Sequence, residues 1–565
     1  MARYQLSLII PALVAILAVV SSLSPSPKCK CFPGDSCWPT PHQWNSLNRT
    51  VGGRLIATVP LGQPCHDPFY DAEVCSSLQS QWQEAPIHME SSSSVMAPFF
   101  ANQSCDPFTK ESKPCLPGNY VRYAVNATSV EDIIATVTFA KSKNIRFVIR
   151  NTGHDYLGRS TGAGSLAIWT HYLKNISFLD WDDPYYKGRS VKVGAGVQGY
   201  EAMAATKAQG LVLVGGECPT VGIAGGYAQG GGHSILSTKF GLAADNTLSF
   251  DVVTADGKFV TASRTQNQDL YWALSGGGPG NYGVVVAVTF KAHPDTHFGG
   301  ASLTFYADSN PTDIFYQGIY AFHEKLPAII DAGAMAVYFF DSTFFSIASL
   351  SLYNGTQEEV KSLLAPFVVQ LSSLGIKYNV TYGESTTYWD HYNKYFGPLP
   401  YGNIQVGIAQ YGGRLIPRSV VANISSTYRS IAEQGVTFIG VGVDVSAFGK
   451  SQENSVLPAW RNAIVHATLS TPWNFTAPWS EMIARQDLMT HKIMPEIEAA
   501  TPNSGAYMNE ADFRQPNFQQ VFFGSNYEKL KKIKQRWDKD GFFYATKSVG
   551  SEAWTILKDG RMCAT

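Results

Sequence analysis

Four clusters of glycine lie between residues 150 and 283, and they constrain the fold more than any other feature of this sequence. They are contained in "RNTGHDYLGRSTGAG", "VGAGVQG", "GGECPTVGIAGGYAQGGGHS" and "SGGGPGNYG". Glycine lets a backbone turn tightly and approach a ligand closely, and the N–H groups of such turns can form a nest for a pyrophosphate. No lysine-bearing phosphate loop of the nucleoside-triphosphate type accompanies them. The clusters therefore predict a long cofactor that lies across several backbone turns.

The region around these clusters, residues 117–296, alternates short apolar strands with helical stretches. "SVEDIIATVTFAKSKN" has a capping Ser129, Asp132 three positions later and helical apolar spacing, so it predicts a helix. Strands are predicted at "IRFVIRN", "SLAIWT", "SVKVGAG" and "LVLVGGE". "SFDVVTADG" and "KFVTAS" predict a hairpin that turns at Asp256 and Gly257. We expect these elements to form one α/β domain.

Residues 297–504 carry longer alternating strands, such as "MAVYFFD", "FSIASLSLY" and "FIGVGVDVSAF", which predict a largely antiparallel sheet covered by helices. Because 565 residues are too many for one compact core, the predicted fold class is α+β with two domains. A C-terminal segment, residues 505–565, follows and includes a basic amphipathic helix. Several aromatic residues of the second half could line an apolar pocket or belong to the ordinary core: Phe339, Phe340, Tyr388, Trp389, Tyr392 and Tyr395.

The first 24 residues, "MARYQLSLIIPALVAILAVVSSLS", predict a cleaved signal peptide. Arg3 precedes an apolar run of about 15 residues, whereas a membrane span needs ~20. A membrane anchor is the alternative, but Pro11 interrupts the run. We therefore expect a secreted protein with no membrane attachment after cleavage.

The cysteines also indicate export. Seven of the nine lie in the first 115 residues, so residues 25–116 are predicted to form a disulfide-stapled extension in an oxidising compartment. Cys65 with Cys75 and Cys105 with Cys115 are natural local pairs, although the sequence leaves the connectivity open. The odd total leaves one thiol over, and Cys218 is isolated from the rest. Eight sequons predict N-glycans: Asn48, Asn102, Asn126, Asn175, Asn354, Asn379, Asn423 and Asn474.

The charges are balanced, with 43 basic and 44 acidic residues and an isoelectric point near 6.9. Such a balance gives no electrostatic signature of nucleic-acid binding or of an anionic membrane surface. A small neutral or apolar partner is more plausible.

One cluster offers an alternative. Gly194, Gly196 and Gly199 form a GxGxxG pattern after a predicted strand, and Glu217 follows about twenty residues later, as in a Rossmann dinucleotide site. A nicotinamide enzyme would gather its glycines there, whereas this chain has three further clusters. A diffusible nicotinamide cofactor is also scarce outside the cell, so the sequence favours the long cofactor over this alternative.

Five motifs occur in a recognisable order: "RNTGHDYLGRSTG", "GGECPTVGIAGGYAQGGGHS", "FGLAADN", "DLYWALSGGGPGNYGVV" and "GSNYEKLKKIKQRWD". With them the chain, from about Pro117 onward, resembles the berberine-bridge-enzyme-like branch of the vanillyl-alcohol-oxidase/PCMH flavoprotein superfamily. In its motifs the chain is similar to secreted fungal proteins described as isoamyl-alcohol-oxidase-like. The Cys-rich extension is matched only loosely.

The resemblance implies FAD as the cofactor, bound covalently at two points. The histidine of the first motif, His154 here, would be joined to the 8α carbon of the flavin, and the cysteine of the second motif, Cys218, to carbon 6. Without the resemblance, His154 reads as a turn histidine and Cys218 as an inert buried thiol. Further FAD-binding residues are expected at Asn151, Gly153, Asp155, Gly158, Arg159, Ser160, Val221, Gly222, Gly225, Gly226 and Asn509.

Two positions near Cys218 bear on the chemistry that the resemblance implies. A small residue at the position of Val221 admits dioxygen in the family, which favours an oxidase over a dehydrogenase. Plant relatives often carry a histidine that contacts the flavin where this chain has Gly226 and Tyr227, and His233 comes later. The chain therefore departs from the plant pattern at the flavin's pyrimidine edge.

The catalytic base is expected in "YMNEAD". Tyr507 and Asn509 match the family's Tyr-x-Asn-Tyr motif, but Glu510 stands where a tyrosine is common. On a strand, Tyr507 and Asn509 would face one side and Glu510 the other. Either Glu510 is a base whose pKa burial raises, or Tyr507 serves and Glu510 pairs structurally with Arg514.

These features predict a secreted, FAD-linked oxidase. It would transfer hydride from an alcohol or activated carbon of a small metabolite to the flavin and then to dioxygen, giving hydrogen peroxide. Biosynthesis of a secondary metabolite is one expected setting. The alternatives are a flavin dehydrogenase with another acceptor and a non-catalytic binding protein. No metal is predicted, because His154, His171 and His233 show no ligand spacing.

Overall fold

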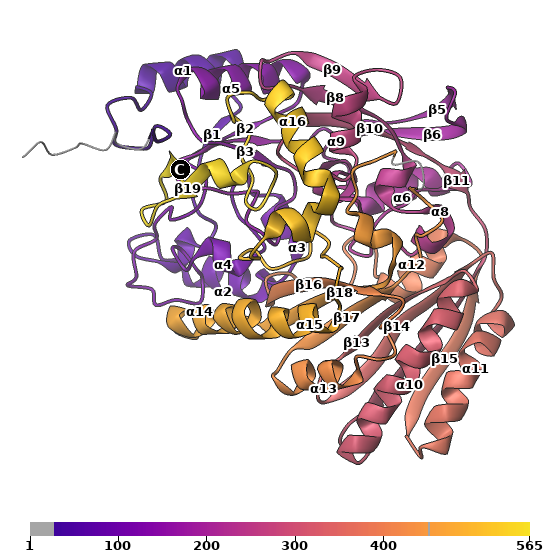
Figure 1. Cartoon of the computed structure of the whole chain (residues 1–565). Coiled ribbons are helices and arrows are strands. Elements are labelled where there is room, and N and C mark those ends of the chain that lie inside the picture. Colours follow the sequence, from indigo (N-terminus) through magenta and orange to yellow (C-terminus); the bar gives the residue numbers. More distant parts are fainter. Residues whose placement is uncertain (1–27, 450–452) are drawn as a thin grey trace, which may run out of the picture.

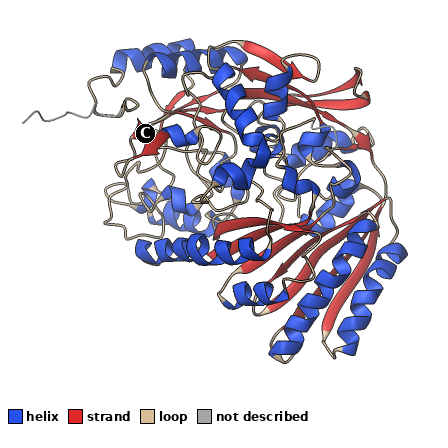
Figure 2. Cartoon of the chain, in the orientation of Figure 1, coloured by secondary structure: helices blue, strands red, loops and turns tan. Residues whose placement is uncertain are grey.

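The computed structural model describes residues 28–449 and 453–565, and the predicted signal peptide lies outside them. Helices and strands are mixed along the chain, and a large sheet with long helices on its outer side forms one end of the molecule (Figures 1 and 2). Within the described residues, no helix is both long and apolar enough to cross a bilayer. The α+β class predicted from the sequence is confirmed.

The first sheet has the order β1-β2-β4-β3, with strands β1 (Leu55–Ala57), β2 (Tyr123–Asn126), β3 (Phe147–Arg150) and β4 (Leu166–Trp169). Strand β4 runs parallel to both β2 and β3. Helices α1 (Pro41–Thr50) and α5 (Val130–Ser142) share its core cluster. The predicted helix is α5, and Ser129 caps it through a box with Asp132. Its apolar side shares a cluster with strand residues that include Phe147 and Leu166.

A second, antiparallel sheet has the order β5-β6-β10-β8-β9, with strands β5 (Ile176–Asp182), β6 (Lys187–Gly194), β8 (Thr247–Val253), β9 (Phe259–Ser263) and β10 (Val284–Lys291). The predicted hairpin is β8–β9, and Gly257 has a φ of +77° at its turn. The predicted strand "LVLVGGE" is reduced to β7 (Leu211–Val212), which pairs with β11 (His293–Pro294). Between these strands lie α6 (Gly199–Lys207), α7 (Ala228–Gly230), α8 (Ser237–Phe240) and α9 (Gln268–Leu274).

The third sheet is the predicted antiparallel one. Its order is β15-β12-β14-β13-β17-β18-β16, with strands β12 (Phe298–Tyr306), β13 (Ala334–Phe340), β14 (Phe344–Tyr353), β15 (Tyr378–Ser385), β16 (Ala409–Pro417), β17 (Thr437–Gly442) and β18 (Ala463–Pro472). Its strands alternate between two cores. In β13, Ala336 and Tyr338 pack with the outer helices, whereas Met335 and Val337 pack with the glycine-rich region.

Helices cover the outer face of this sheet. They are α10 (Thr312–Asp331), α11 (Gln357–Ser373), α13 (Ser425–Glu433) and α15 (Met494–Ala500), and residues of all four share one apolar cluster with the sheet. Residues 297–504 also contain the helices α12 (Tyr388–Phe396) and α14 (Trp479–Leu488). Among the aromatic residues, Phe340 belongs to the helix-side core, while Phe339, Tyr388, Trp389, Tyr392 and Tyr395 pack on the glycine-rich side.

A buried ion pair joins the glycine-rich region, residues 117–296, to the sheet-based region that follows it, residues 297–504. Arg461 donates two hydrogen bonds to the Asp245 carboxylate, with Nη1–Oδ2 at 2.9 Å and Nη2–Oδ1 at 2.8 Å. Asn454 donates a third, at 2.7 Å. The bidentate geometry fixes the sheet-based region against the glycine-rich region.

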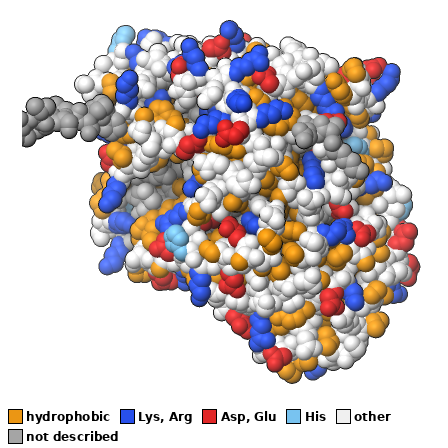
Figure 3. Space-filling view, viewed as in Figure 1, with side chains coloured by type: hydrophobic (Ala, Val, Ile, Leu, Met, Phe, Trp, Pro, Cys, Tyr) orange, Lys and Arg blue, Asp and Glu red, His pale blue; other side chains and the backbone are white. Residues whose placement is uncertain are grey.

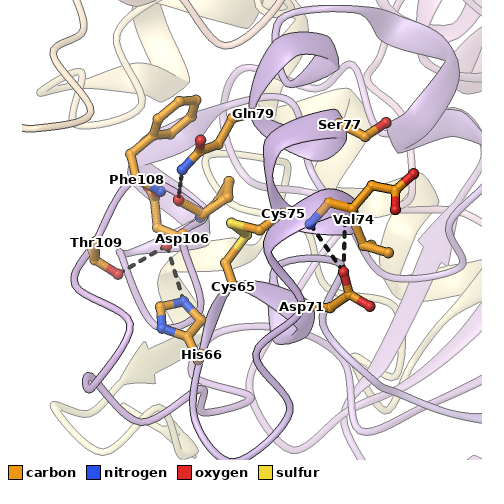
Figure 4. The surroundings of a disulfide bond; sticks show 12 residues. Cys65, His66, Asp71, Val74, Cys75, Ser77, Gln79, Asp106, Phe108 and Thr109 are labelled. Atoms are coloured by element: carbon orange, nitrogen blue, oxygen red, sulfur yellow. Dashed lines mark hydrogen bonds between the residues drawn. A yellow bond between two sulfur atoms is a disulfide. The ribbon is translucent and has the colours of Figure 1, made fainter.

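The Cys-rich extension carries α2 (Ala72–Gln81), α3 (Ala85–Met89) and α4 (Pro98–Ala101). Disulfides join Cys65 to Cys75 and Cys105 to Cys115, as the local spacing predicts. Around the first of these, His66 approaches the Asp106 carbonyl at 3.1 Å through Nε2 (Figure 4). Burial raises the pKa of the Asp106 carboxyl to about 6. The extension is thus tied by its own local crosslinks.

The C-terminal segment returns to the first half of the chain. Helix α16 (Tyr527–Trp537) is the predicted amphipathic helix, and strands β19 (Trp554–Ile556) and β20 (Met562–Ala564) form a small ladder. Phe542 stacks on Phe147 of β3. A disulfide joins Cys29 to Cys563, across 534 residues. The remaining pair is Cys31 with Cys37, and Cys218 stays free.

Candidate functional site

The loop after β3 carries His154, and its own side chains hold its shape. Asp155 accepts hydrogen bonds from the backbone N–H groups of Leu157 and Arg159, at 2.9 and 2.8 Å. It also pairs with the Arg159 guanidinium at 2.8 Å. Gly158 has a φ of +74°, which disfavours other residues there. Arg159 then donates to the Met508 carbonyl at 2.7 Å, so the loop is anchored to the C-terminal segment.

The two predicted attachment residues meet at one hydroxyl. Nε2 of His154 lies 2.9 Å from Oγ1 of Thr220, and Sγ of Cys218 lies 3.4 Å from the same oxygen. Burial lowers the pKa of His154 to about 3, so its imidazole is neutral. Burial also raises the pKa of the Cys218 thiol, and the neighbouring carboxylates of Glu510 and Glu217 raise it further. Residues that are 64 positions apart in the sequence therefore face one site.

Backbone and amide groups surround this pair. Asn151 donates to the Ala195 carbonyl at 2.5 Å, and its Nδ2 stands 2.2 Å from where a Cβ on Gly222 would lie. Asn509 donates to the Gly226 carbonyl at 2.8 Å, and Gln229 to the Gly225 carbonyl at 3.1 Å. Gly153 (φ +92°) and the buried Ser160 complete the predicted set.

These residues fit a flavin nucleotide. The amide oxygens of Asn151, Gln229 and Asn509 are buried without a hydrogen-bond partner, and buried polar atoms are normally satisfied. A Cβ on Gly226 would meet nothing closer than 3.7 Å, so the backbone there is open to a neighbouring group. Unpaired acceptors beside an open glycine backbone suit a heterocycle that carries N–H donors.

A cluster of charged and polar side chains lies beside the attachment pair. The Glu510 carboxylate bridges two histidines, with Oε1 3.0 Å from Nε2 of His233 and Oε2 2.9 Å from Nε2 of His466. Thr468 donates to Oε2 at 2.9 Å. On its other side, His233 faces Glu217, with Nδ1 3.1 Å from Oε2. The four side chains form a continuous network, Glu217–His233–Glu510–His466.

The network fixes the charge of its members. Burial alone would lower the pKa of His233, but Glu217 and Glu510 raise it well above its usual value. Burial would raise the pKa of Glu510, but His233 and His466 hold it well below its usual range. Burial lowers the pKa of His466. Glu510 is therefore a carboxylate, and the expectation of a raised pKa is wrong because the two histidines outweigh burial.

The predicted strand geometry of "YMNEAD" is also wrong. The backbone N–H of Glu510 donates to the Tyr507 carbonyl at 3.0 Å, which makes this segment a turn. Asn509 donates to the Tyr507 hydroxyl at 2.9 Å, and Tyr507 packs edge-on against His466, with ring centroids 5.3 Å apart. The predicted pairing of Glu510 with Arg514 does not form, because Arg514 pairs with Asp487 at 2.5 Å. Tyr507 and Glu510 thus face the same cluster.

Sequence reasoning missed several members of the site. His466 and Thr468 lie on β18, where Val465, Ala467 and Leu469 pack with the outer helices. Polar residues at every second position of an otherwise apolar strand are the signal that could have found them. Tyr156 stacks on Tyr411 of β16, with ring centroids 3.9 Å apart, and no local pattern predicts that contact.

The Rossmann alternative fails on topology. Strand β6, which ends at Gly194, is antiparallel to both β5 and β10, whereas the fingerprint requires a parallel βαβ unit. Cβ atoms on Gly194 and Gly196 would lie about 2 Å from the carbonyls of Leu173 and His171. These glycines therefore allow backbone segments to pack closely. Glu217 faces His233 in the cluster described above.

The fold and this arrangement define a flavoprotein with an FAD-binding half and a sheet-based second half. Residues 121–263 match the family model "FAD binding domain", and residues 506–550 match "Berberine and berberine like". The chain is 57% identical to FAD-linked oxidoreductase ZEB1 of Gibberella zeae over 554 residues, 98% of each chain. It is 48% identical to FAD-linked oxidoreductase patO of Aspergillus clavatus, over 95% of each.

Among solved structures, the VAO-type flavoprotein MtVAO615 of Myceliophthora thermophila C1 has a TM-score of 0.92 and 40% identity, and the match covers 95% of this chain and 100% of that one. The chain belongs to the VAO-type, berberine-bridge-enzyme-like family of FAD-linked oxidoreductases. The resemblance stated from the five motifs is confirmed.

Proposed function

We propose that this protein is a bicovalent FAD oxidase that acts on an alcohol or activated carbon of a small metabolite. The observation that carries the proposal is the meeting of His154 and Cys218 at the Thr220 hydroxyl. An unpaired thiol in a chain whose other eight cysteines are bonded supports a role for Cys218 outside the disulfides. A relative 39% identical to this chain is named bifunctional decalin synthase, which supports a biosynthetic setting.

Bound FAD would accept hydride from the substrate carbon and pass the electrons to dioxygen, which leaves as hydrogen peroxide. The protein's own residues would orient the substrate and remove the proton of its hydroxyl. Tyr507 and Glu510 stay the two predicted bases, and both lie in the cluster beside Cys218. Of the two, Glu510 has the more open side chain, with 28% exposed, but its pKa, held well below its usual range, makes its carboxylate a weak proton acceptor. Val221, which is half-buried, supports access of dioxygen.

Secretion and glycosylation remain part of the proposal. Six of the sequon asparagines are exposed, namely Asn102, Asn175, Asn354, Asn379, Asn423 and Asn474, whereas Asn48 and Asn126 are half-buried. Asn48 also accepts a hydrogen bond from the Leu55 N–H through its side-chain oxygen. We therefore expect glycans on the six exposed sites first. On the face shown in Figure 3, basic and acidic side chains are interspersed, which suits a protein with a small uncharged substrate.

Acid precipitation of the purified protein tests the covalent links. The wild-type pellet should stay yellow, and peptide mass spectrometry should find flavin on His154 and Cys218. Each single variant, His154→Ala or Cys218→Ala, should keep one link, and the double variant should release its flavin. A colourless wild-type pellet would sink the proposal. Oxygen consumption with a panel of alcohols, against a quinone acceptor in argon, separates an oxidase from a dehydrogenase.

A further inference from the structure

Three side chains from distant parts of the sequence direct metal-ligating atoms to one point. His233 follows the turn after α7, His466 lies on β18, and Glu510 belongs to the C-terminal segment. One ligand atom from each lies within 4.8 Å of the others, and the two imidazole–carboxylate distances are 3.0 and 2.9 Å. Because 277 residues separate His233 from Glu510, spacing along the sequence could not reveal this group.

The chemistry of the three donors suits a first-row divalent cation. Two imidazole nitrogens and one carboxylate are a ligand set that Zn²⁺ uses with a fourth position left open. Bonds of about 2.0–2.2 Å place tetrahedral ligand atoms roughly 3.3 Å apart, close to the spacing observed here. The Glu510 side chain keeps 28% exposure, so a fourth ligand can approach from its side.

Neighbouring side chains contact the three ligand residues and restrict their orientation. Oε2 of Glu217 lies 3.1 Å from Nδ1 of His233, on the side of the ring opposite to Glu510. A carboxylate behind a histidine is the usual outer support of a metal ligand. Thr468 holds Oε2 of Glu510 at 2.9 Å. Oε1 of Glu217 is buried without a hydrogen-bond partner, so this charge has no full compensation from the protein.

We propose that His233, His466 and Glu510 bind one divalent cation of the zinc type, with Glu217 as a positioning residue. The cation would leave a coordination position for an oxygen ligand such as a substrate hydroxyl. Binding would displace the proton that His233 holds between Glu217 and Glu510, place Glu510 among the ligands and leave Tyr507 as the nearby group able to exchange a proton. The proposal goes beyond the proposed function and requires no covalent flavin.

Metal analysis of the purified full-length protein tests this site directly. After dialysis against chelator-treated buffer, elemental analysis should find about one zinc-type cation per chain, or stripped protein should take up one Zn²⁺ or Co²⁺. Bound Co²⁺ should give tetrahedral absorption bands in a difference spectrum against the Zn²⁺ form. His466→Ala and Glu510→Gln should abolish this binding, and Glu217→Gln should weaken it 10- to 100-fold.

The matched control is His42→Ala, which removes an exposed histidine and should leave the stoichiometry at one. Circular dichroism and flavin content verify folding in each variant, and the wild-type titration decides the matter even if a variant fails to fold. Stripped wild-type protein that takes up neither Zn²⁺ nor Co²⁺ would overturn the proposal, as would unchanged binding in His466→Ala. The cation count is independent of the acid-pellet test, so the two proposals can fail separately.

Discussion

At the scale of single residues, Thr220 connects the two residues of the proposed attachment site. Its hydroxyl contacts the imidazole of His154 and the thiol of Cys218, so it holds both side chains toward one point. The residue is fully buried, and a lost hydrogen bond there would leave two polar groups without a partner. The hydroxyl thus sets how well the two attachment atoms are prepositioned.

We expect Thr220→Val to lower the fraction of chains that carry both flavin links, because valine keeps the shape and removes the hydroxyl. The lost hydrogen bond should also cost about 1 kcal/mol of unfolding free energy. Thr220→Ser is the control, and it should keep both links. Quantitative mass spectrometry of the flavin-bearing peptides measures the effect. Equal double linkage in the valine and serine variants would contradict this role.

Gly222 offers a second test at this scale. Its φ of −72° is open to any residue, so the cost of Gly222→Ala comes from the Cβ that would lie 2.2 Å from Nδ2 of Asn151. The displaced Asn151 would lose its bond to Ala195, and we expect flavin content to fall by half or more. Gly215→Ala is the control, because its Cβ would meet nothing closer than 3.7 Å. The ratio of flavin to protein absorbance reads out both variants.

At the scale of elements, local patterns predicted the strands and helices well and the site only partly. The capping box at Ser129 and the hairpin at Gly257 depend on residues close in sequence, and both formed as predicted. The meeting of His466 with Glu510 depends on how β18 pairs between β16 and β17, which no local pattern records. The segment after Tyr507 turns instead of extending, because contacts with distant residues override its local preference.

The ion pair of Arg461 with Asp245 allows the contact between two elements to be tested. It joins the turn before β18 to the turn before β8, and both side chains are largely buried. Arg461→Ala should cost about 3–5 kcal/mol, because it leaves the Asp245 carboxylate buried and unpaired. Arg461→Ala with Asp245→Ala should cost less than the sum of the two single changes. Thermal unfolding of the three variants gives the coupling, and strict additivity would argue against it.

At the scale of the whole molecule, buried histidines set the response to acid. Burial lowers the pKa of His88 and His323 to about 4 and of His391 to about 3. The unfolded chain binds protons at these groups below about 6.5, while the folded chain does not until about 4, or about 3 for His391, so stability falls as pH falls across that window. Asp106, with its pKa raised to about 6, acts in the opposite direction.

We therefore expect the unfolding free energy to decrease from pH 6.5 to pH 4, by at most about 1.4 kcal/mol per pH unit for each such histidine. His323→Gln removes one of these titrations while keeping a partner for Tyr338. Denaturant midpoints at several pH values should show a shallower slope for this variant than for the wild type. Parallel slopes would show that His323 does not contribute.

The crosslink between Cys29 and Cys563 gives the molecule a fixed order of assembly. Synthesis at about 5–20 residues per second separates these two cysteines by roughly 30–100 s, whereas Cys65 and Cys75 emerge within about 2 s of each other. In an oxidising compartment the local pairs could close during synthesis, but the long one must wait for the last strand. During that interval Cys29 is a nascent thiol beside Cys31 and Cys37. An early bond between Cys31 and Cys37 would leave Cys29 available for Cys563, so the order in which these bonds form bears on the yield of correctly folded protein.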